Sequence, residues 1–231
     1  MAERLAVLDF DLSLFKTYDF AETLESYYVS QGVDLSRLVY EQGTAPDLLA
    51  LIEEAAGHTI DVDVSAIEKF ALERFGKSPH DYIQPDAFTL LHALEAERDT
   101  DATILTRGGE RSQRVKLAFA ARAIGEMDTT IISVDEPPKG ELIAGWYENG
   151  AYHYLHHGEQ HSAPNVILVD DKIGDFVGLP ANKSATGIWV QRRAVSERER
   201  LLHRDLNRSG HHIFAINGLQ HAIQLLKSKA A

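Results

Sequence analysis

Residues 5–13 read LAVLDFDLS, a run of four apolar residues that ends in two closely spaced aspartates, Asp9 and Asp11. A short apolar run bounded by polar residues is typical of a strand that is buried on both faces of a parallel sheet. We therefore expect a buried strand at residues 5–8, with two carboxylates at its carboxyl end.

Similar apolar runs recur along the chain and alternate with amphipathic stretches. Strands that alternate with helices build a parallel sheet covered by helices on both faces. Further strands are expected at residues 102–105, 130–134, 166–169, 187–190 and 213–216. The sequence thus predicts an α/β fold with a three-layer, Rossmann-like parallel sheet as its core.

The long stretch between the first two expected strands has helical periodicity instead. Three helices are expected there, beginning near Asp19, Asp47 and Ser65, and a fourth begins at Pro85 and belongs with the sheet. We therefore expect an all-α unit inserted into the sheet domain. The expected division is a core of residues 1–15 and 84–231 and an insertion of residues 16–83.

The composition excludes several kinds of site and partner. The chain has 231 residues, a formal net charge of −12 and no cysteine, so thiolate metal sites, disulfides and cysteine nucleophiles are excluded. An acidic balance repels phosphate backbones, and nucleic acid is therefore not an expected partner. Because the sequence has no signal-peptide pattern and no apolar run of about 20 residues, we expect no membrane association and a cytoplasmic location.

Candidate functional side chains follow the expected strands. In an open parallel sheet, ligands bind at the carboxyl ends of the strands, so residues that follow different strands meet at one edge. These residues are Asp9, Asp11, Thr106, Arg107, Gly108, Lys139, Asp170, Asp171 and Asp175.

Their chemistry suits a hard cation together with an anion. Mg²⁺ prefers oxygen ligands and commonly shares carboxylates with a substrate phosphate. Thr106 and the backbone amides of Arg107 and Gly108 can form an anion-binding nest, and Lys139 supplies a positive charge. The sequence therefore predicts a Mg²⁺ and phosphate site at this edge.

The same residues resemble the four motifs of the haloacid dehalogenase-like phosphohydrolase superfamily. The motifs are Asp9-x-Asp11-x-Ser13, Thr106, Lys139 before Gly140, and Asp170-Asp171-x-x-x-Asp175, in the family's order. The helical insertion looks like the family's type 1 cap. Three positions depart from the usual pattern, namely Ser13 for threonine, Arg107 for a small or amide residue, and Asp170 for glycine.

The resemblance implies phosphoryl transfer through an aspartyl phosphate. Asp9 would be the nucleophile and Asp11 the general acid and base. Mg²⁺ would be held by the Asp9 carboxylate, the Asp11 carbonyl and Asp171, with Asp170 or Asp175 in support. Lys139 and Thr106 would stabilise the transferring phosphoryl group.

The expected function is that of a Mg²⁺-dependent phosphatase acting on a small phosphorylated metabolite. One alternative is a phosphomutase that uses the same intermediate. Another is a non-catalytic protein that binds phosphate or a partner, although such a protein has no need for both Asp9 and Asp11.

A second group of residues invites a metal hypothesis. Four histidines, His153, His156, His157 and His161, lie within nine residues, in or just after a hairpin expected at residues 147–152. Their spacing follows no regular metal-binding pattern, so a structural or surface role is favoured over zinc binding.

Overall fold

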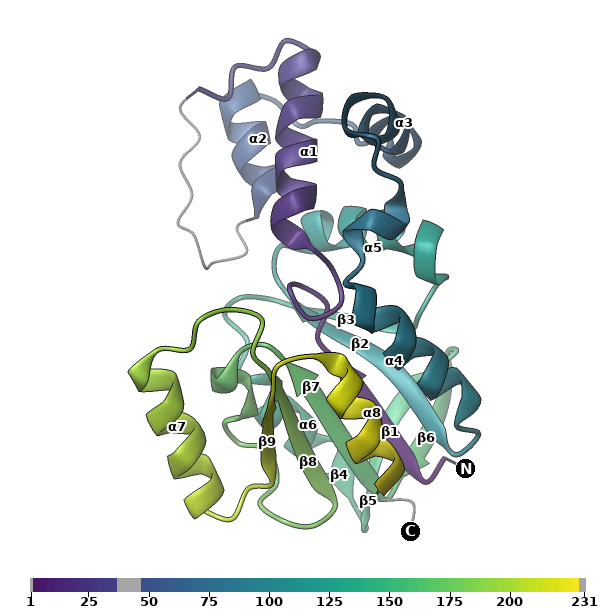
Figure 1. The fold of residues 1–231 in the computed structure, drawn as a ribbon, viewed down its shortest axis with the longest axis vertical. Helices are drawn as coiled ribbons and strands as arrows, with labels where there is room; N and C mark the ends of the chain where they lie inside the picture. The colour runs from purple at the N-terminus through teal and green to yellow at the C-terminus, as the bar shows by residue number, and fades with distance from the viewer. Residues whose placement is uncertain (1, 37–46, 229–231) are drawn as a thin grey trace.

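Six parallel strands form one sheet in the computed structural model, which describes residues 2–36 and 47–228. Their order is β3-β2-β1-β7-β8-β9 (Figure 1). The strands are β1 (Arg4–Leu8), β2 (Thr100–Arg107), β3 (Thr129–Ile132), β7 (Asn165–Asp170), β8 (Ala185–Val190) and β9 (Ile213–Ile216). Each corresponds to a strand expected from the sequence, and the predicted α/β class is confirmed.

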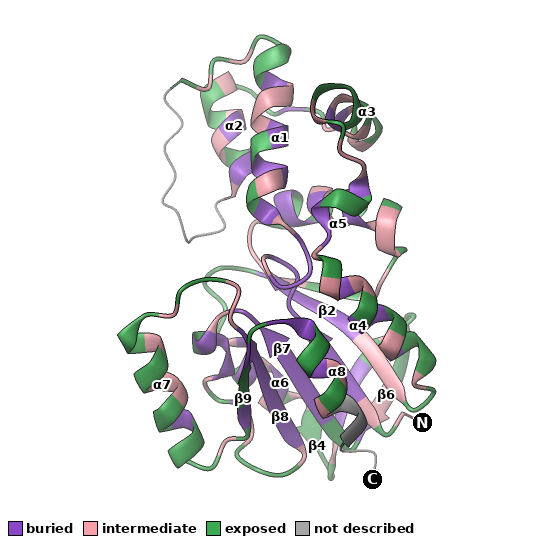
Figure 2. Ribbon diagram, viewed as in Figure 1, coloured by how far each residue is buried: buried purple, intermediate pink, exposed green. Residues whose placement is uncertain are grey.

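Successive side chains of a strand point to opposite faces of the sheet. Both faces of this sheet carry apolar side chains, and helices cover both. Ala6 and Leu8 of β1 face one hydrophobic core, whereas Leu5 and Val7 face another. The first core is covered by α4 (Pro85–Ala96), α5 (Glu110–Ile124) and α8 (Leu219–Ser228). The second is covered by α6 (Lys139–Gly145), η2 (Ile173–Phe176), α7 (Glu197–Arg208) and a small antiparallel sheet. β8 between these layers is buried along its whole length (Figure 2).

The predicted helical insertion follows β1. It consists of α1 (Thr17–Ser30), α2 (Leu48–Ala56), α3 (Val64–Phe75) and η1 (Pro79–Tyr82). Figure 1 shows these helices beyond the carboxyl ends of the strands. The chain enters and leaves the insertion along paired segments, since the Lys16 amide donates to the Tyr82 carbonyl and the Gln84 amide to the Leu14 carbonyl. The domain division at residues 15/16 and 83/84 remains a prediction.

Two of the three expected helix starts in the insertion differ in detail. Asp47 caps α2 as expected and accepts a hydrogen bond from the Ala50 amide. Asp19 lies in the first turn of α1, which begins at Thr17, and is not its cap. Asp63, not Ser65, caps α3 by accepting from the amides of the next turn. In α3 the neighbour Asp63 reaches the free amides, whereas the residue before α1, Lys16, makes no side-chain capping hydrogen bond.

The small sheet contains the expected hairpin and one strand more. β4 (Tyr147–Glu148) pairs with β5 (Ala151–His156) through a turn in which Asn149 and Gly150 have φ values of 52° and 89°. β5 then pairs with β6 (Glu159–Ala163), which the sequence did not predict. The sequence of β6 is polar because the strand is exposed over most of its length, so it has no apolar run to indicate it.

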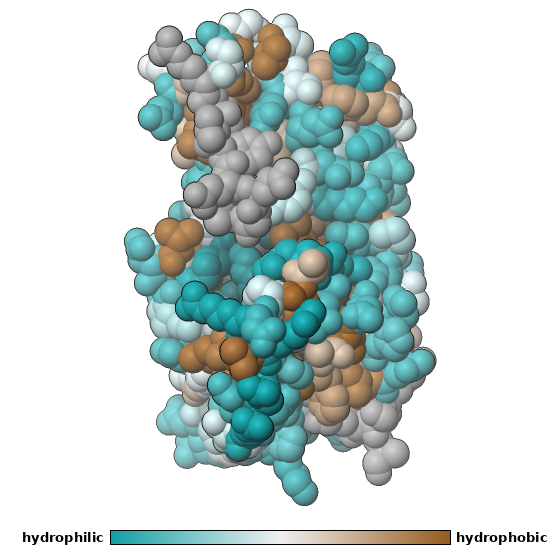
Figure 3. All heavy atoms as spheres, turned by 60° about the vertical axis from the view of Figure 1, so that its left-hand side comes forward, coloured by the Kyte–Doolittle hydropathy of each residue, from teal (hydrophilic) through white to brown (hydrophobic). Residues whose placement is uncertain are grey.

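Whether a helix can cross a membrane depends on its length and its apolar character. Among residues 2–36 and 47–228, no helix combines the length and the apolar character needed to cross a bilayer. Hydrophilic side chains predominate on the face drawn in Figure 3, where hydrophobic ones form small separate patches.

A pair of glycines tests the packing of α6. A Cβ at Gly140 would lie 2.5 Å from the Val177 carbonyl oxygen, whereas one at Gly145 would have nothing within 4 Å. We expect Gly140→Ala to lower the free energy of unfolding by about 1–3 kcal/mol, because backbone must move. Gly145→Ala should raise it by up to about 1 kcal/mol, because alanine favours the helix. Urea unfolding measures both values, and equal effects would contradict the close packing.

Candidate active site

The strand order brings the ends of three strands together. β1 lies between β2 and β7, where the direction of the chain's progress across the sheet reverses. In parallel sheets this reversal leaves a crevice at the carboxyl edge, in which ligands bind. Asp9 follows β1, Asp170 ends β7 and Thr106 lies near the end of β2. The candidate residues from these three strands therefore share one site.

A cluster of three carboxylates forms the centre of the site. Asp9, Asp170 and Asp171 are all buried and each offers an oxygen within 4.8 Å of the others. The Lys139 ammonium, only 1% exposed, contacts Asp9 and lies 2.6 Å from Asp170 Oδ2. The Lys172 amide donates to the other oxygen of Asp170 at 2.7 Å. We call these four residues, Asp9, Lys139, Asp170 and Asp171, the carboxylate cluster.

The carboxylate cluster carries more negative than positive charge. Although burial opposes charge on the Lys139 amine, the surrounding Asp170 and Asp9 carboxylates raise its pKa, so it stays protonated. Burial, assisted by the charge of Asp9, raises the pKa of Asp171 to about 7. Three carboxylates thus share one ammonium group, and Asp171 takes up a proton in place of a second cation.

A divalent cation fits this arrangement. Asp171 Oδ1 is buried and has no hydrogen-bond partner. Such an orphaned oxygen is costly unless something binds it, and hard cations take carboxylate oxygens as ligands. The carboxylate cluster could therefore hold a metal ion through Asp9, Asp170 and Asp171.

Thr106 lies near the end of β2, the strand beside β1, but the residues that follow it make their contacts within the protein. The Thr106 hydroxyl is fully buried without a partner. The Arg107 guanidinium donates to the carbonyls of Ser133, Glu136 and Pro137 and pairs with Asp175 at 3.2 Å. The Gly108 amide donates to the Ile132 carbonyl. In this arrangement the Arg107 side chain and the Gly108 amide are occupied by the protein itself.

Asp175 contacts two other candidate residues, Lys139 and Arg107. Its Oδ1 accepts a hydrogen bond from the Lys139 amide at 3.2 Å and pairs with Arg107. It is absent from the group of carboxylates that could share an ion among the described residues. The structure thus places Asp175 where it orients the start of α6, and its role as a metal ligand remains a prediction.

Asp11 is held by residues that the sequence did not indicate. Lys116 Nζ lies 2.6 Å from both carboxylate oxygens, while Gln113 and Thr17 each donate one hydrogen bond. Burial alone would raise the pKa of Asp11, but Lys116 and these hydrogen bonds bring it below its ordinary value. Leu12, with a φ of 63°, turns the chain sharply after Asp11. The side chain is therefore ionised and directed toward α5.

A signal for these partners does exist in the sequence. Gln113 and Lys116 are three residues apart, so they lie on one face of α5, which also carries the buried Phe119 and Ala120. A lysine on an otherwise buried helix face needs a counter-charge nearby. The spacing thus indicates an acidic partner but does not say which one.

The fold can be compared with known proteins. No family model matches the sequence, and no curated protein matches it. Among solved structures, the chain is similar over 100% of its length, and 100% of the other chain, to a protein described as a haloacid dehalogenase-like hydrolase from Burkholderia xenovorans LB400, with 13% identity and a TM-score of 0.54. The chain has the haloacid dehalogenase-like fold.

Two other structures with the haloacid dehalogenase-like description are more distant. The hydrolase YfnB of Bacillus subtilis, described as bound to magnesium, has 11% identity and a TM-score of 0.49 over 98% of this chain and 99% of that one. An L-2-haloacid dehalogenase from Xanthobacter autotrophicus has 16% identity and a TM-score of 0.46 over the same shares. The similarity to the Burkholderia xenovorans protein, with its TM-score of 0.54, confirms the fold expected from the four motifs.

The protonation of Asp171 predicts a pH effect on stability. Its pKa is about 7 when folded, against an ordinary value of 3.8, so the folded chain binds the extra proton between these values. In a chelator, the contribution of Asp171 to the free energy of unfolding should then fall as pH rises across this window, by at most about 4 kcal/mol. Asp171→Asn should remove this contribution, whereas the exposed control Asp135→Asn should not. Chemical unfolding at several pH values measures the difference, and parallel curves for all three proteins would refute it.

The pairing of Lys116 with Asp11 predicts an effect on stability. Lys116→Met should lower the free energy of unfolding by about 3–5 kcal/mol, because it leaves a buried carboxylate without its counter-charge. Adding Asp11→Asn should recover most of the loss. The exposed Lys69, which pairs with Glu73 across one helical turn, provides a matched control whose replacement should cost less than about 0.5 kcal/mol. Additive losses in the double variant would show that the pair is not coupled.

Proposed function

We propose that this protein is a Mg²⁺-dependent phosphatase that acts on a small phosphorylated metabolite through an aspartyl-phosphate intermediate. The observation that carries the proposal is the carboxylate cluster itself. It places a buried carboxylate, Asp9, against a buried ammonium group, Lys139, and leaves the nearby Asp171 with an unpartnered oxygen. A phosphate dianion and a divalent cation would together complete the charge and hydrogen bonding of these groups.

Asp9 is the proposed nucleophile. It follows the central strand β1, so the sheet fixes the position of its backbone, whose amide donates to the Val169 carbonyl at 2.8 Å. Its carboxylate contacts the buried ammonium group of Lys139. One of its oxygens would attack phosphorus while the bond to the leaving oxygen breaks, which divides hydrolysis into two easier displacements.

Asp11 is the proposed general acid and base. It would protonate the leaving oxygen in the first step and take a proton from water in the second, when the bond between Asp9 and phosphorus breaks. Because Lys116 holds it ionised, Asp11 must part from Lys116 and bind a proton before the first step. In the second step Asp11 accepts a proton, and its ionised resting form is already suited to that.

Lys139 and Thr106 are the proposed stabilisers of the phosphoryl group. Both are buried, and preorganised donors in a water-excluded site stabilise developing charge more strongly than water does. The Thr106 hydroxyl has no partner within the protein and is free to donate to a phosphoryl oxygen. Lys139 would compensate part of the charge on Asp9 as the two anions approach.

Mg²⁺, held by Asp9 and Asp171 with the Asp11 carbonyl and either Asp170 or Asp175, would neutralise charge shared by the phosphate and the carboxylates. Of the two supporting residues, Asp170 is the better placed, since Asp175 pairs with Arg107. This choice also explains why the chain has an aspartate at position 170. Its second oxygen pairs with Lys139 and thereby limits the repulsion within the cluster.

The helical insertion is the proposed specificity element. It docks on the first turn of α5, where Ser112 contacts Asp47 and Arg111 contacts Glu53. Since α5 begins just after Thr106, this docking brings the insertion to the phosphate side of the site. Residues of α1 and α2 would then contact the part of the substrate that is not phosphate.

Turnover of an aryl phosphate tests the proposal. We expect the purified protein to release inorganic phosphate from p-nitrophenyl phosphate with Mg²⁺ and to stop when a chelator is added. Asp9→Asn should reduce the rate by at least about a hundredfold, because it removes the nucleophile. The exposed Asp135→Asn should retain the wild-type rate.

Two further measurements separate the steps and the alternatives. Asp11→Asn should slow alkyl phosphates more than aryl phosphates, whose leaving groups need no proton. During turnover, the intact mass of the Asp11→Asn variant should increase by one phosphoryl group. Full turnover in excess chelator, or an Asp9→Asn enzyme as fast as the wild type, would refute the mechanism. Isomerisation of a sugar phosphate without phosphate release would indicate a mutase instead.

A further inference from the structure

A second group of metal-binding side chains lies at the opposite edge of the sheet. Asp101 is the second residue of β2 and Asp128 directly precedes β3, so both mark the amino ends of these strands. His156 ends β5 and His157 begins the turn to β6. The small antiparallel sheet thus brings its histidines to the edge that faces away from the carboxylate cluster. A cavity of about 320 Å³ is lined in part by Asp101, Asp128, His156 and His157.

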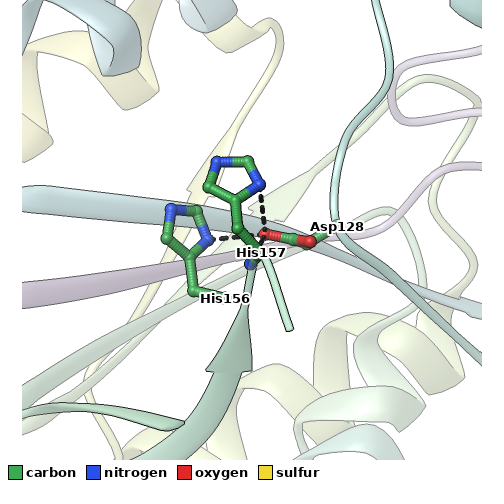
Figure 4. Close-up of side chains that lie close together, drawn as sticks. All are labelled: Asp128, His156 and His157. Atoms are coloured by element: carbon green, nitrogen blue, oxygen red, sulfur yellow. Dashed lines mark hydrogen bonds and ion pairs between the residues drawn. The ribbon is translucent and has the colours of Figure 1, made fainter. Parts of the chain in front are cut away.

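Three of these residues converge on one point. Figure 4 shows the imidazole rings of His156 and His157 turned toward the carboxylate of Asp128. Asp128 Oδ2 lies 2.7 Å from His156 Nδ1 and 3.5 Å from His157 Nδ1. Each residue offers a ligand atom within 4.8 Å of the other two. The His157 amide also donates to Asp128 Oδ2 at 2.8 Å, which fixes the carboxylate beside the turn.

The ring of His156 is oriented from its other side. Its Nε2 lies 3.7 Å from Asp101 Oδ1, and Asp101 is itself held by the Tyr154 hydroxyl at 2.7 Å and by His161 Nδ1 at 2.8 Å. Both ring nitrogens of His156 therefore face a carboxylate, Nδ1 that of Asp128 and Nε2 that of Asp101. If a metal ion binds Nδ1, the Nε2 proton points toward Asp101, as is usual for a histidine ligand.

This arrangement places two possible electron-pair donors side by side. His156 Nδ1 is buried and makes no hydrogen bond, although Asp128 Oδ2 is only 2.7 Å away. At this separation the two atoms need a positive charge between or next to them, which a proton or a metal ion can supply. The nearby His157 ring supplies the third ligand that a metal ion needs and a proton does not.

We propose that Asp128, His156 and His157 bind a Zn²⁺ ion, with Asp101 as the residue that orients His156. Two imidazole nitrogens and one carboxylate oxygen are a common zinc ligand set that leaves a fourth position for water. Mg²⁺ does not suit the site, because it prefers oxygen ligands throughout. The ion would join the turn between β5 and β6 to the residue that directly precedes β3, and so fix the small sheet to the large one.

Titration with Zn²⁺ alone tests this site. The protein is first saturated with Mg²⁺, so that the carboxylate cluster is occupied, and Zn²⁺ is then added in a calorimeter. We expect one equivalent to bind and the thermal unfolding midpoint to rise. His156→Ala and Asp128→Asn should each weaken Zn²⁺ binding by at least about tenfold and abolish the rise.

Control variants separate this site from other surface histidines. His153, whose ring contacts the Glu148 carbonyl, and His212, which precedes β9, lie outside the group, so their alanine variants should bind Zn²⁺ as the wild type does. His157→Asn provides a variant that keeps the turn, because asparagine tolerates the φ of 50° found there. It should also weaken binding. If Zn²⁺ fails to bind, or binds equally to His156→Ala, His157→Asn and His153→Ala, a proton fills the place assigned to the metal and the proposal is wrong.

Discussion

The ammonium group of Lys139 is the constraint on which the rest of the site depends. It is almost completely buried and touches both Asp9 and Asp170, which come from strands β1 and β7 and lie 161 residues apart in the sequence. Removing one partner from such a buried group leaves an uncompensated charge that costs several kcal/mol. Two neighbouring side chains hold the lysine in this position. Arg107 ties the loop before α6 to β2, and Asp175 accepts the hydrogen bond of the Lys139 amide.

The insertion shares a hydrophobic core with the sheet domain. Aromatic rings form a continuous contact from the end of β1 into the insertion and back to α5, with Phe10 stacked on Phe15 at 4.9 Å and Phe20 packed on Phe119 at 4.8 Å. Tyr82, at the exit from the insertion, packs on both Phe20 and Phe119. Movement of the insertion as a lid would have to disturb these contacts. Under the proposed function, side chains on α1 and α2 would therefore set substrate specificity without a large rotation of the insertion.

The fold could be predicted further from the sequence than the site. Apolar runs reveal strands buried on both faces, such as β7 and β8, whereas the polar strand β6 leaves no such signal because it is stabilised by pairing. The acidic residues at strand ends followed from topology, since parallel strands bring their carboxyl ends together. The hydrogen-bonding partner of each acidic residue could not be predicted from topology. Asp11 pairs with Lys116, which lies 105 residues later in the chain, and a pairing over that distance cannot be read from spacing. The histidines likewise had no regular spacing, because Asp128 joins them from another part of the chain.

The position of β1 inside the sheet affects how the chain is made. β1 pairs with β2, about a hundred residues later in the chain, and with β7, where Leu8 aligns with Val169. Contacts between such distant segments slow folding, because a long loop must close before they form. During synthesis, the apolar residues 5–8 are made before both of their partner strands. An unpaired apolar strand is prone to aggregate, so we expect this segment to be a risk for aggregation until β7 is available to pair with it.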